Sequence, residues 1–361
     1  MQGYLLFPDG RALQGELIGA KRPQLGELVF NTSMTGYQEI LTDPSYHRQI
    51  VVLTYPEVGN YGCHLEVSES TLGHAAGMVL RNLSPGSFHN RYQQTFDAFL
   101  AEIGVTAIIG LDTRKLTQMI RDEGPRNVMI VPAEIAVEEA AKDLAAAAPM
   151  AGANLVPEVS TQEKVIHGDG ETHIVLLDLG IKLATIRALV ERGCRVTQVP
   201  WNTDFAAIEA LKPDGILLSN GPGDPAAVPG VRPTVAKLMD TYPTMGICLG
   251  FQLMALAIGG ETYKLPFGHR GGNHPVKFDK RVVITSQNHG FAVHEESIPV
   301  DTCEITHHSL FDGSLEGFRM REKPVFGVQF HPEAAPGPND CLDHFDYFLK
   351  QVNQHKGGGD A

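Results

Sequence analysis

The sequence predicts an α/β protein of two domains: a β-rich α/β domain, then a domain with a mostly parallel central sheet flanked by helices. Its 361 residues are enough for two domains of ordinary size, each with its own core. Short β-like segments dominate the beginning of the chain. After residue 173, apolar strands alternate with helical segments, which is typical of a parallel sheet covered on both faces.

Composition narrows the classes of protein that fit. Hydrophobic residues make up 43% of the chain and charged residues 20%, as in soluble globular proteins. The formal net charge of −13 would repel phosphate backbones, so we expect no nucleic-acid partner. No apolar run approaches the ~18 residues that span a bilayer. The first residues also lack the basic and apolar regions of a secretion signal, so we expect neither membrane association nor export.

The cysteines favour a reducing compartment. All 5 lie far apart, and no two form a Cys-x-x-Cys pair. This argues against a zinc ribbon and against a disulfide framework. We therefore expect no metal site, and a cytoplasmic location.

Residues 1–150 are predicted to form the first domain. Its four expected strands, the first two separated by a Pro-Asp-Gly turn, are residues 4–7, 13–18, 27–31 and 49–55. Residues 113–122 are expected to form an amphipathic helix, capped by Asp112 or Thr113 and ending near Gly124. The alanine- and glutamate-rich residues 133–148 are expected to form a second helix.

Residues 173–355 are predicted to form the second domain, after a polar linker over 151–172 and before a flexible tail over 356–361. The expected strands are residues 173–179, 195–199, 215–219, 243–247 and 325–328. The expected helices are residues 182–192 and 205–211, with a further helix-length apolar stretch after Cys248. In such sheets sites form at the carboxyl ends of strands, so the residues that follow these strands are the candidates for function.

Cys248 follows the fourth of these strands, between Gly246 and Gly250. Glycines on both sides of a nucleophile are typical of a nucleophile elbow, a sharp strand-to-helix turn that exposes the side chain and leaves room only for glycine. The helix N-terminus lowers a thiol's pKa and offers free N–H groups to an oxyanion. The same pattern also fits a buried cysteine beside helix-packing glycines.

Three more motifs follow strands or lie in the loops beyond them. The Ser-Asn-Gly-Pro-Gly-Asp-Pro loop at 219–225 fits either a backbone oxyanion donor or an ordinary turn. His331 and Glu333 stand two residues apart, so Glu333 is a candidate to orient the imidazole, and His331 to take the thiol proton and protonate a leaving amine. The third motif, Gln-Asn-His-Gly-Phe at 287–291, is suited to lining a pocket.

Together, and in this order and spacing, the elbow, the 219–225 loop and the terminal His-Pro-Glu resemble the class I (triad) glutamine amidotransferase domain over about residues 173–350. The first domain resembles that of the carbamoyl phosphate synthetase small-subunit family. The segments similar to that family are residues 30–46, 111–117, 267–275 and 309–313. The resemblance therefore spans nearly the whole chain.

The resemblance implies a glutaminase. Cys248 would attack the side-chain amide of L-glutamine to give a thioester and ammonia, and water would then release glutamate. His331 would be the general acid and base, and Glu333 its orienting partner. The oxyanion donors would be backbone N–H groups at Leu249 and in the loop 221–223. The positions implied to bind L-glutamine, drawn from both domains, are Ser45, Gly221, Gly223, Leu249, Gln252, Asn288, Gly290 and Phe291.

The resemblance also implies a partner. The chain has no Gly-x-x-x-x-Gly-Lys-Ser/Thr loop and no candidate carboxylate cluster for magnesium and ATP, so we expect no cofactor in this chain. A large subunit would use ATP, magnesium and bicarbonate, receive the ammonia through an internal tunnel and make carbamoyl phosphate for arginine and pyrimidine biosynthesis. We expect a heterodimer, or a higher oligomer of heterodimers.

Other interpretations are open at this point. Residues 1–150 argue against the glutaminase of a GMP, CTP or anthranilate synthetase, and the complete triad argues against an inactive docking subunit. A cysteine peptidase also fits an elbow with a Cys-His pair. Two positions depart from the family pattern: Phe251 stands where many relatives have histidine, and Ala184 where asparagine is common. We interpret both as variation in packing that leaves the mechanism intact.

Overall fold

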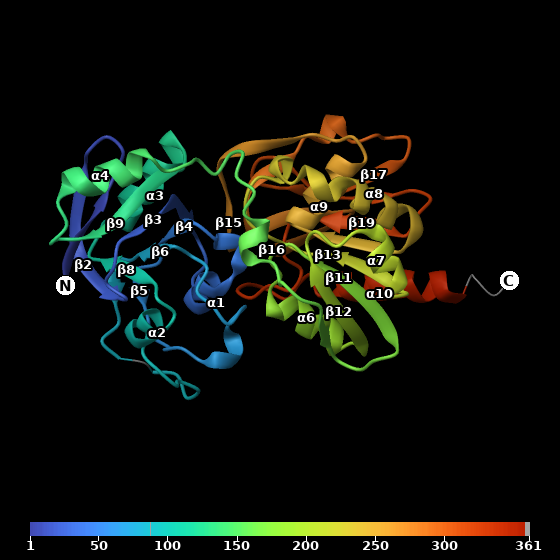
Figure 1. Ribbon diagram of the computed structural model, residues 1–361, viewed down its shortest axis with the longest axis horizontal. Coiled ribbons are helices and arrows are strands. Elements are labelled where there is room, and N and C mark those ends of the chain that lie inside the picture. Colours follow the sequence, from blue (N-terminus) through green and yellow to red (C-terminus); the bar gives the residue numbers. More distant parts are fainter. Residues whose placement is uncertain (87, 358–361) are drawn as a thin grey trace. The chain divides into compact units, whose positions relative to one another are not determined.

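The computed structural model describes residues 1–86 and 88–357, and the chain divides into two compact units, Met1–Met150 and Ala151–Ala361. Both units combine strands and helices, which confirms the predicted α/β class (Figure 1). Each unit has its own hydrophobic core.

A closed barrel forms the centre of the first unit, with its strands in the order β1-β2-β8-β6-β4-β3-β9. The pairs β3/β4, β4/β6 and β6/β8 are parallel and the others antiparallel. The four strands expected from the sequence are confirmed as β1, β2, β3 and β4. The strands of this unit are β1 (Gln2–Leu6), β2 (Ala12–Gly19), β3 (Gln24–Asn31), β4 (Gln49–Leu53), β5 (Glu57–Val58), β6 (Gly77–Val79), β7 (Asn82–Leu83), β8 (Thr106–Ile109) and β9 (Arg126–Pro132).

The helices of the first unit are α1 (Tyr37–Thr42), α2 (Phe96–Glu102), α3 (Thr113–Glu123) and α4 (Val137–Ala145), with 3₁₀ turns at Pro44–Tyr46 and Leu65–Val67. The Asp112 side chain accepts the Lys115 N–H at 3.0 Å, which confirms it as the N-cap of α3. Helix α4 is shorter than the predicted 133–148. The backbone at Ala136 is extended, and the Ile135 N–H turns back to the Pro132 carbonyl, so the end of β9 delays the helix despite its high alanine content.

A ten-stranded sheet runs through the second unit in the order β10-β12-β11-β13-β14-β19-β18-β17-β15-β16. Strands β12, β11, β13, β14 and β19 are parallel, as predicted, and the remaining pairs are antiparallel. The strands are β10 (Val165–His167), β11 (Thr172–Asp178), β12 (Cys194–Pro200), β13 (Gly215–Leu218), β14 (Thr244–Ile247), β15 (Thr262–Phe278), β16 (Arg281–Val293), β17 (Cys303–Ser309), β18 (Leu315–Met320) and β19 (Val325–Val328).

Helices cover both faces of the parallel strands. On β11, Val175 and Leu177 belong to the core shared with α8 and α9, while Ile174 and Leu176 belong to the core shared with α6 and α10. This alternation is what a strand buried on both faces requires. The helices are α5 (Val156–Val159), α6 (Leu183–Val190), α7 (Phe205–Ala210), α8 (Arg232–Thr241), α9 (Leu249–Ala257) and α10 (Asp343–Gly357), with 3₁₀ turns at Pro225–Ala227, Pro229–Val231 and Glu295–Ser297. Across the described ranges, no helix is long and apolar enough to span a bilayer.

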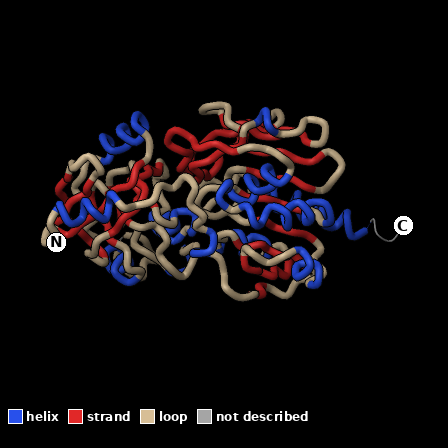
Figure 2. Tube along the Cα trace, turned by 45° about the horizontal axis from the view of Figure 1, so that its top comes forward, coloured by secondary structure: helices blue, strands red, loops and turns tan. Residues whose placement is uncertain are grey.

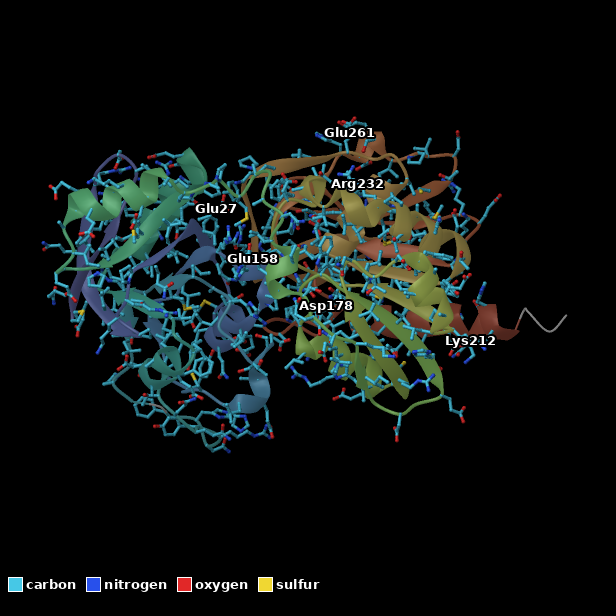
Figure 3. The ribbon with its side chains drawn as sticks, viewed as in Figure 1. Glu27, Glu158, Asp178, Lys212, Arg232 and Glu261 are labelled. Carbon is cyan, nitrogen blue, oxygen red and sulfur yellow. The ribbon has the colours of Figure 1, made fainter. Side chains whose placement is uncertain are left out.

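The structure differs from the prediction at both ends of the second domain. The segment 151–172 contains α5 and β10, and it belongs to the second unit instead of forming a linker. Its backbone is held by two carboxylates: Thr161 N–H donates to Asp178 at 2.7 Å, and Gly152 N–H donates to Asp224 at 2.8 Å. Figure 3 labels Asp178, at the end of β11, and Glu158 in α5.

At the other end, α10 continues through residues 356 and 357, the first two of the predicted flexible tail. The Lys356 ammonium lies 2.9 Å from an Asp214 carboxylate oxygen, which ties the last turn of the helix to the loop before β13. Residues 358–361 of the predicted tail lie outside the described residues.

The antiparallel strands β15 to β18 were not predicted. In Figure 2 this region consists mainly of strands (red) and loops (tan). β15 contains prolines and glycines that are typical of loops, and its pairing with β16 shifts register twice, between Lys264 and His269 and between Gly271 and His274. Such bulges let a strand accommodate proline and glycine, so the residue types alone favoured a loop.

A buried pair of histidines predicts acid sensitivity of the second unit. The His307 ring stacks on Phe278, and its Nε2 lies 3.3 Å from Nε2 of His344 in α10. Burial, together with the charges of His344, His308 and Arg281, lowers the pKa of His307 to about 2. Below pH ~6.5, His307 takes up a proton in the unfolded chain but not in the folded chain. Protonation therefore stabilises the unfolded state, and the free energy of unfolding decreases as the pH falls below that value.

We expect this site to reduce the free energy of unfolding by roughly 2 kcal/mol between pH 7.5 and pH 5. Urea unfolding at both pH values measures it. In His307→Asn the loss over this pH range should be smaller. An identical loss in both proteins would contradict the assignment.

Candidate active site

Cys248 lies in a strand-to-helix turn, as predicted. β14 ends at Ile247 and α9 begins at Leu249, and Cys248 between them has φ 51° and ψ −104°. A positive φ is unusual for a residue with a side chain and is typical of strained functional turns. The Cys248 N–H donates to the Val328 carbonyl at 2.9 Å, which joins the turn to the end of β19.

The two flanking glycines are needed for space. A Cβ at Gly246 would lie 2.3 Å from the Met254 sulfur, and a Cβ at Gly250 would lie 2.2 Å from the Leu218 carbonyl oxygen. Any side chain at either position would displace α9 from β13 and β14. These contacts confirm the reason for the predicted elbow: the turn leaves room only for glycine on either side of Cys248.

The sequence left open whether Cys248 is exposed on an elbow or buried. Cys248 is 2% exposed, and its Sγ donates to the Asn288 carbonyl oxygen on β16 at 3.7 Å. The thiol is therefore both on an elbow and buried. The sequence could not decide between the two because β16, which covers the thiol, belongs to the unpredicted antiparallel strands.

His331 and Glu333 follow β19 and interact directly. Nδ1 of His331 lies 2.7 Å from Oε1 of Glu333, and both side chains are buried. The His331 N–H donates to the Ser286 carbonyl at 2.9 Å, which fixes the loop against β16. Within the described residues, Nε2 of His331 has no hydrogen-bond partner at normal distance, although the ring interacts with the Cys248 side chain.

The charges around this pair favour an ionised carboxylate and a basic imidazole. Burial opposes the charged form of His331, but the Glu333 charge and the contacts with the Cys248 and Glu333 side chains outweigh it and raise the pKa of His331. Burial likewise opposes ionisation of Glu333, but the charges of Lys182 and His331 outweigh it and lower the pKa of Glu333. The imidazole is therefore a stronger base than a free histidine.

Lys182, predicted only as the first residue of a helix, also belongs to this site. The side chain is 2% exposed, its Nζ lies 3.2 Å from Oε1 of Glu333, and it donates to the Ala334 carbonyl. A buried ammonium is stable only with such partners. The available signal was its place just after β11, at the carboxyl end of a parallel strand.

The loop 219–225 lies against the elbow. A Cβ at Gly221 would lie 2.1 Å from the Leu179 carbonyl oxygen and 2.9 Å from Cδ2 of Leu249. Gly223 has φ 92°, and a Cβ there would lie 2.6 Å from the Ala153 carbonyl oxygen. The structure thus brings the predicted oxyanion loop next to Leu249, and close packing leaves room only for glycine at both positions.

The remaining predicted glutamine positions divide between the two units. Asn288, Gly290 and Phe291 lie on β16, and Gln252 on α9 donates to the Phe291 carbonyl at 2.8 Å and to Oε1 of Gln329 at 2.9 Å. Because both N–H groups of Gln252 are engaged, only its carbonyl oxygen is left to contact a ligand. Ser45 lies in the first unit, where the Asp43 side chain accepts its N–H at 2.8 Å, and its role in binding stays a prediction.

The two departures from the family pattern lie outside this set of contacts. Phe251 is fully buried and packs on Phe318, with ring centroids 5.3 Å apart, in the core on the α8 side of the sheet. Cys248 belongs to the other core. Ala184 lies in the first turn of α6.

One further group of side chains has the donor set of a metal site. Among the described residues, His269, His289 and Glu316 bring three ligand atoms within 4.8 Å of one another. They come from three separate strands of the unpredicted antiparallel region. Sequence spacing therefore gave no indication of the cluster.

Comparison with known proteins assigns the chain to a family. Residues 175–351 match the model of "Glutamine amidotransferase class-I", and residues 5–130 match "Carbamoyl-phosphate synthase small chain, CPSase domain". The carbamoyl phosphate synthase small chain of Salmonella typhimurium is 44% identical over 98% of this chain and 97% of its own length. Those of Methanopyrus kandleri and Pseudomonas aeruginosa are each 45% identical over 98% of this chain, and over 100% and 98% of their own lengths. The chain therefore belongs to the carbamoyl phosphate synthase small-chain family, and its second unit carries the class I glutamine amidotransferase domain.

Proposed function

We propose that this chain hydrolyses L-glutamine to glutamate and ammonia for a carbamoyl phosphate synthase. The observation that carries the proposal is the buried set of Cys248 on its elbow, His331 and Glu333, within a chain of this family. A thiol only 2% exposed suits a small amide better than a polypeptide, which argues against a peptidase.

The proposed reaction begins with His331 taking the Cys248 proton while the sulfur attacks the side-chain carbonyl carbon of glutamine. The resulting imidazolium gives its proton to the amide nitrogen, the C–N bond breaks, and ammonia and a thioester remain. His331 then takes a proton from water, which attacks the thioester and releases glutamate and the thiol. Glu333, kept ionised by Lys182, holds the imidazole in one orientation throughout.

The oxyanion would be bound by backbone N–H groups. The first N–H groups of a helix have no intrahelical partner, so that of Leu249 at the start of α9 is a donor of the required kind. The glycine loop that packs on Leu249 would supply the second donor. The glutamine would be held by Ser45, Gly221, Gly223, Leu249, Gln252, Asn288, Gly290 and Phe291.

The ammonia would be used by a large subunit. This hydrolysis needs no cofactor, and ATP, magnesium and bicarbonate would be bound by that partner, in a heterodimer or an oligomer of heterodimers. The product, carbamoyl phosphate, would feed arginine and pyrimidine synthesis. All five cysteines are free, which suits the reducing cytoplasm.

An alkylating glutamine analogue tests the nucleophile. We expect one adduct on Cys248, loss of glutamine hydrolysis, and protection by excess glutamine. Cys303, equally buried and also free, is the internal control and should stay unlabelled. Absence of an adduct at Cys248 would indicate an inactive docking subunit. Cleavage of peptides without ammonia release from glutamine would indicate a peptidase.

Adding the large subunit tests the partnership. Glutamine hydrolysis should be slow in the isolated chain and faster in the complex. Equal rates with and without the large subunit would contradict the coupling.

A further inference from the structure

Three buried side chains from three strands each direct one polar atom at a common point. Nδ1 of His269 on β15 lies 3.5 Å, and Nε2 of His289 on β16 lies 3.9 Å, from Oε1 of Glu316 on β18. Within residues 1–86 and 88–357, none of these three atoms has a hydrogen-bond partner. A buried polar atom without a partner costs roughly 1–3 kcal/mol, and an ion pair between His269 and Glu316 would still leave Nε2 of His289 unsatisfied, so this point indicates a ligand.

The second polar atom of each side chain is already engaged, and this fixes what the first can do. Nδ1 of His289 lies 2.8 Å from the Phe291 carbonyl oxygen, which can only accept. Nδ1 therefore carries the hydrogen, and Nε2 presents a lone pair when the ring is neutral.

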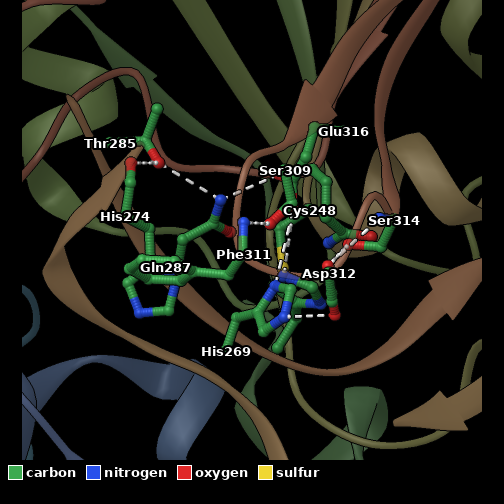
Figure 4. Close-up of polar contacts among 12 residues, drawn as sticks. Cys248, His269, His274, Thr285, Gln287, Ser309, Phe311, Asp312, Ser314 and Glu316 are labelled. Carbon is green, nitrogen blue, oxygen red and sulfur yellow. Dashed lines mark hydrogen bonds and ion pairs between the residues drawn. The ribbon is translucent and has the colours of Figure 1, made fainter. Parts of the chain in front are cut away.

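His269 and Glu316 are oriented in the same way. Nε2 of His269 lies 2.9 Å from Oδ2 of Asp312, and Oε2 of Glu316 accepts from Nε2 of Gln287 at 2.8 Å. Figure 4 shows these four side chains and their contacts. Nδ1 of His269 and Oε1 of Glu316 are left facing the lone pair of His289. Acceptors that face one another in a buried place require a positive species between them.

We propose that this cluster binds a divalent transition-metal ion, with Zn²⁺ the best fit, through His269, His289 and Glu316. Two imidazoles and a carboxylate are a donor set that zinc prefers, with water as the fourth ligand. Metal-ligating histidines characteristically donate their other N–H to a carboxylate or a backbone carbonyl, as Asp312 and Phe291 provide here.

Two of the three separations between ligand atoms are already close to those of a zinc site. Tetrahedral zinc, with bonds of about 2.1 Å, places its ligand atoms about 3.4 Å apart. The two measured separations, 3.5 and 3.9 Å, are close to this value. The third pair, Nδ1 of His269 and Nε2 of His289, lies within 4.8 Å, so binding would also draw these two rings together.

A proton is the competing occupant. Burial opposes charging of His269, but the carboxylates of Asp312 and Glu316 outweigh it and raise the pKa of His269 to about 9. A proton on Nδ1 of His269 would form a hydrogen bond to Oε1 of Glu316, but Nε2 of His289 would still lack a donor. A metal ion would bind all three atoms. A requirement for His289 therefore distinguishes a bound metal ion from a bound proton.

The ion would position β16 and take no part in the hydrolysis. The same strand presents the Asn288 carbonyl to Cys248 and the Phe291 carbonyl to both His289 and Gln252. Its loss should therefore weaken glutamine binding more than turnover, a consequence that rests on the proposed function. The metal content itself does not depend on that function.

Metal content per chain tests the proposal directly. The untagged full chain is treated with a chelator, titrated with Zn²⁺ or Co²⁺, and analysed by elemental analysis and absorption spectroscopy. We expect one ion per chain, and a Co²⁺ spectrum without thiolate charge-transfer bands, since no cysteine is a ligand. Glu316→Gln and His289→Asn should each weaken binding by about 100-fold or more, and Asp312→Asn, which leaves all three ligands in place, by about 10-fold.

His274→Asn is the matched control, because His274 is also a buried histidine of β15, with its ring 5.3 Å from that of His269, and is not a ligand. It should retain one ion. Circular dichroism establishes that each variant is folded. The proposal is overturned if the wild-type chain binds no stoichiometric ion, or if Glu316→Gln and His289→Asn bind as tightly as His274→Asn. If the chain hydrolyses glutamine but binds no ion, the metal proposal fails and the proposed function stands.

Discussion

Replacing Cys248 by serine is expected to reduce glutamine hydrolysis by about 10⁴-fold or more, the scale of loss when a nucleophile is removed from a triad. The serine hydroxyl holds its proton much more strongly than a thiol, so His331 cannot generate the nucleophile as readily. Serine is slightly smaller than cysteine, so it fits the same buried space. The fold should therefore be retained.

Glutamate formation and thermal unfolding measure the two effects separately. Cys303→Ser is the matched control, because Cys303 is equally buried and lies on β17, and it should retain full activity. In the complex, added ammonia should restore carbamoyl phosphate synthesis by Cys248→Ser, because it bypasses the lost step. A variant that keeps more than a few per cent of the glutaminase rate would rule out Cys248 as the nucleophile.

Replacing Lys182 by methionine is expected to destabilise the protein by about 3 kcal/mol, because it removes the ammonium from a buried ion pair and leaves Glu333 with only the His331 imidazole. Methionine has a similar length and no charge, so the change isolates the charge. Lys182 is the largest favourable influence on ionisation of Glu333, and without it the pKa of Glu333 rises. A protonated Glu333 would hold the imidazole less firmly, so we expect kcat/KM to fall by about 10- to 100-fold.

Urea unfolding and steady-state kinetics test this prediction. Lys323→Met is the control: Lys323 pairs with Asp240 at 2.6 Å, but both side chains are solvent-accessible. Such surface pairs contribute less than about 1 kcal/mol, so this variant should unfold and react like the wild type. If Lys182→Met is as stable as Lys323→Met, Glu333 does not depend on Lys182.

The parallel half of the second unit was predictable because its signals are local. Apolar strands, Gly246 and Gly250 around Cys248, and the short His331 to Glu333 spacing all act within a few residues, and each is confirmed in place. The tertiary contacts around the active site were harder to predict from the sequence. Lys182 meets Glu333 across about 150 residues of chain, an interaction that spacing cannot indicate.

The antiparallel half was missed for a different reason. Its longest strand, β15, includes prolines and glycines at bulges, so its composition favoured a loop. Without β15 and β16, the burial of Cys248 could not be decided, and the cluster of His269, His289 and Glu316 could not be predicted. The segment 151–172 was misassigned because its polar backbone is bonded by Asp178 and Asp224, which lie far along the chain.

The short strand β10 also determines how one edge of the ten-stranded sheet meets solvent. It adds three residues, Val165–His167, antiparallel to β12. A longer open edge would offer a row of N–H and carbonyl groups to a strand of a second molecule. With β10 in place, an incoming strand finds only a few such groups. A chain that began at residue 173 would lose this cover and expose β12 to edge-to-edge association.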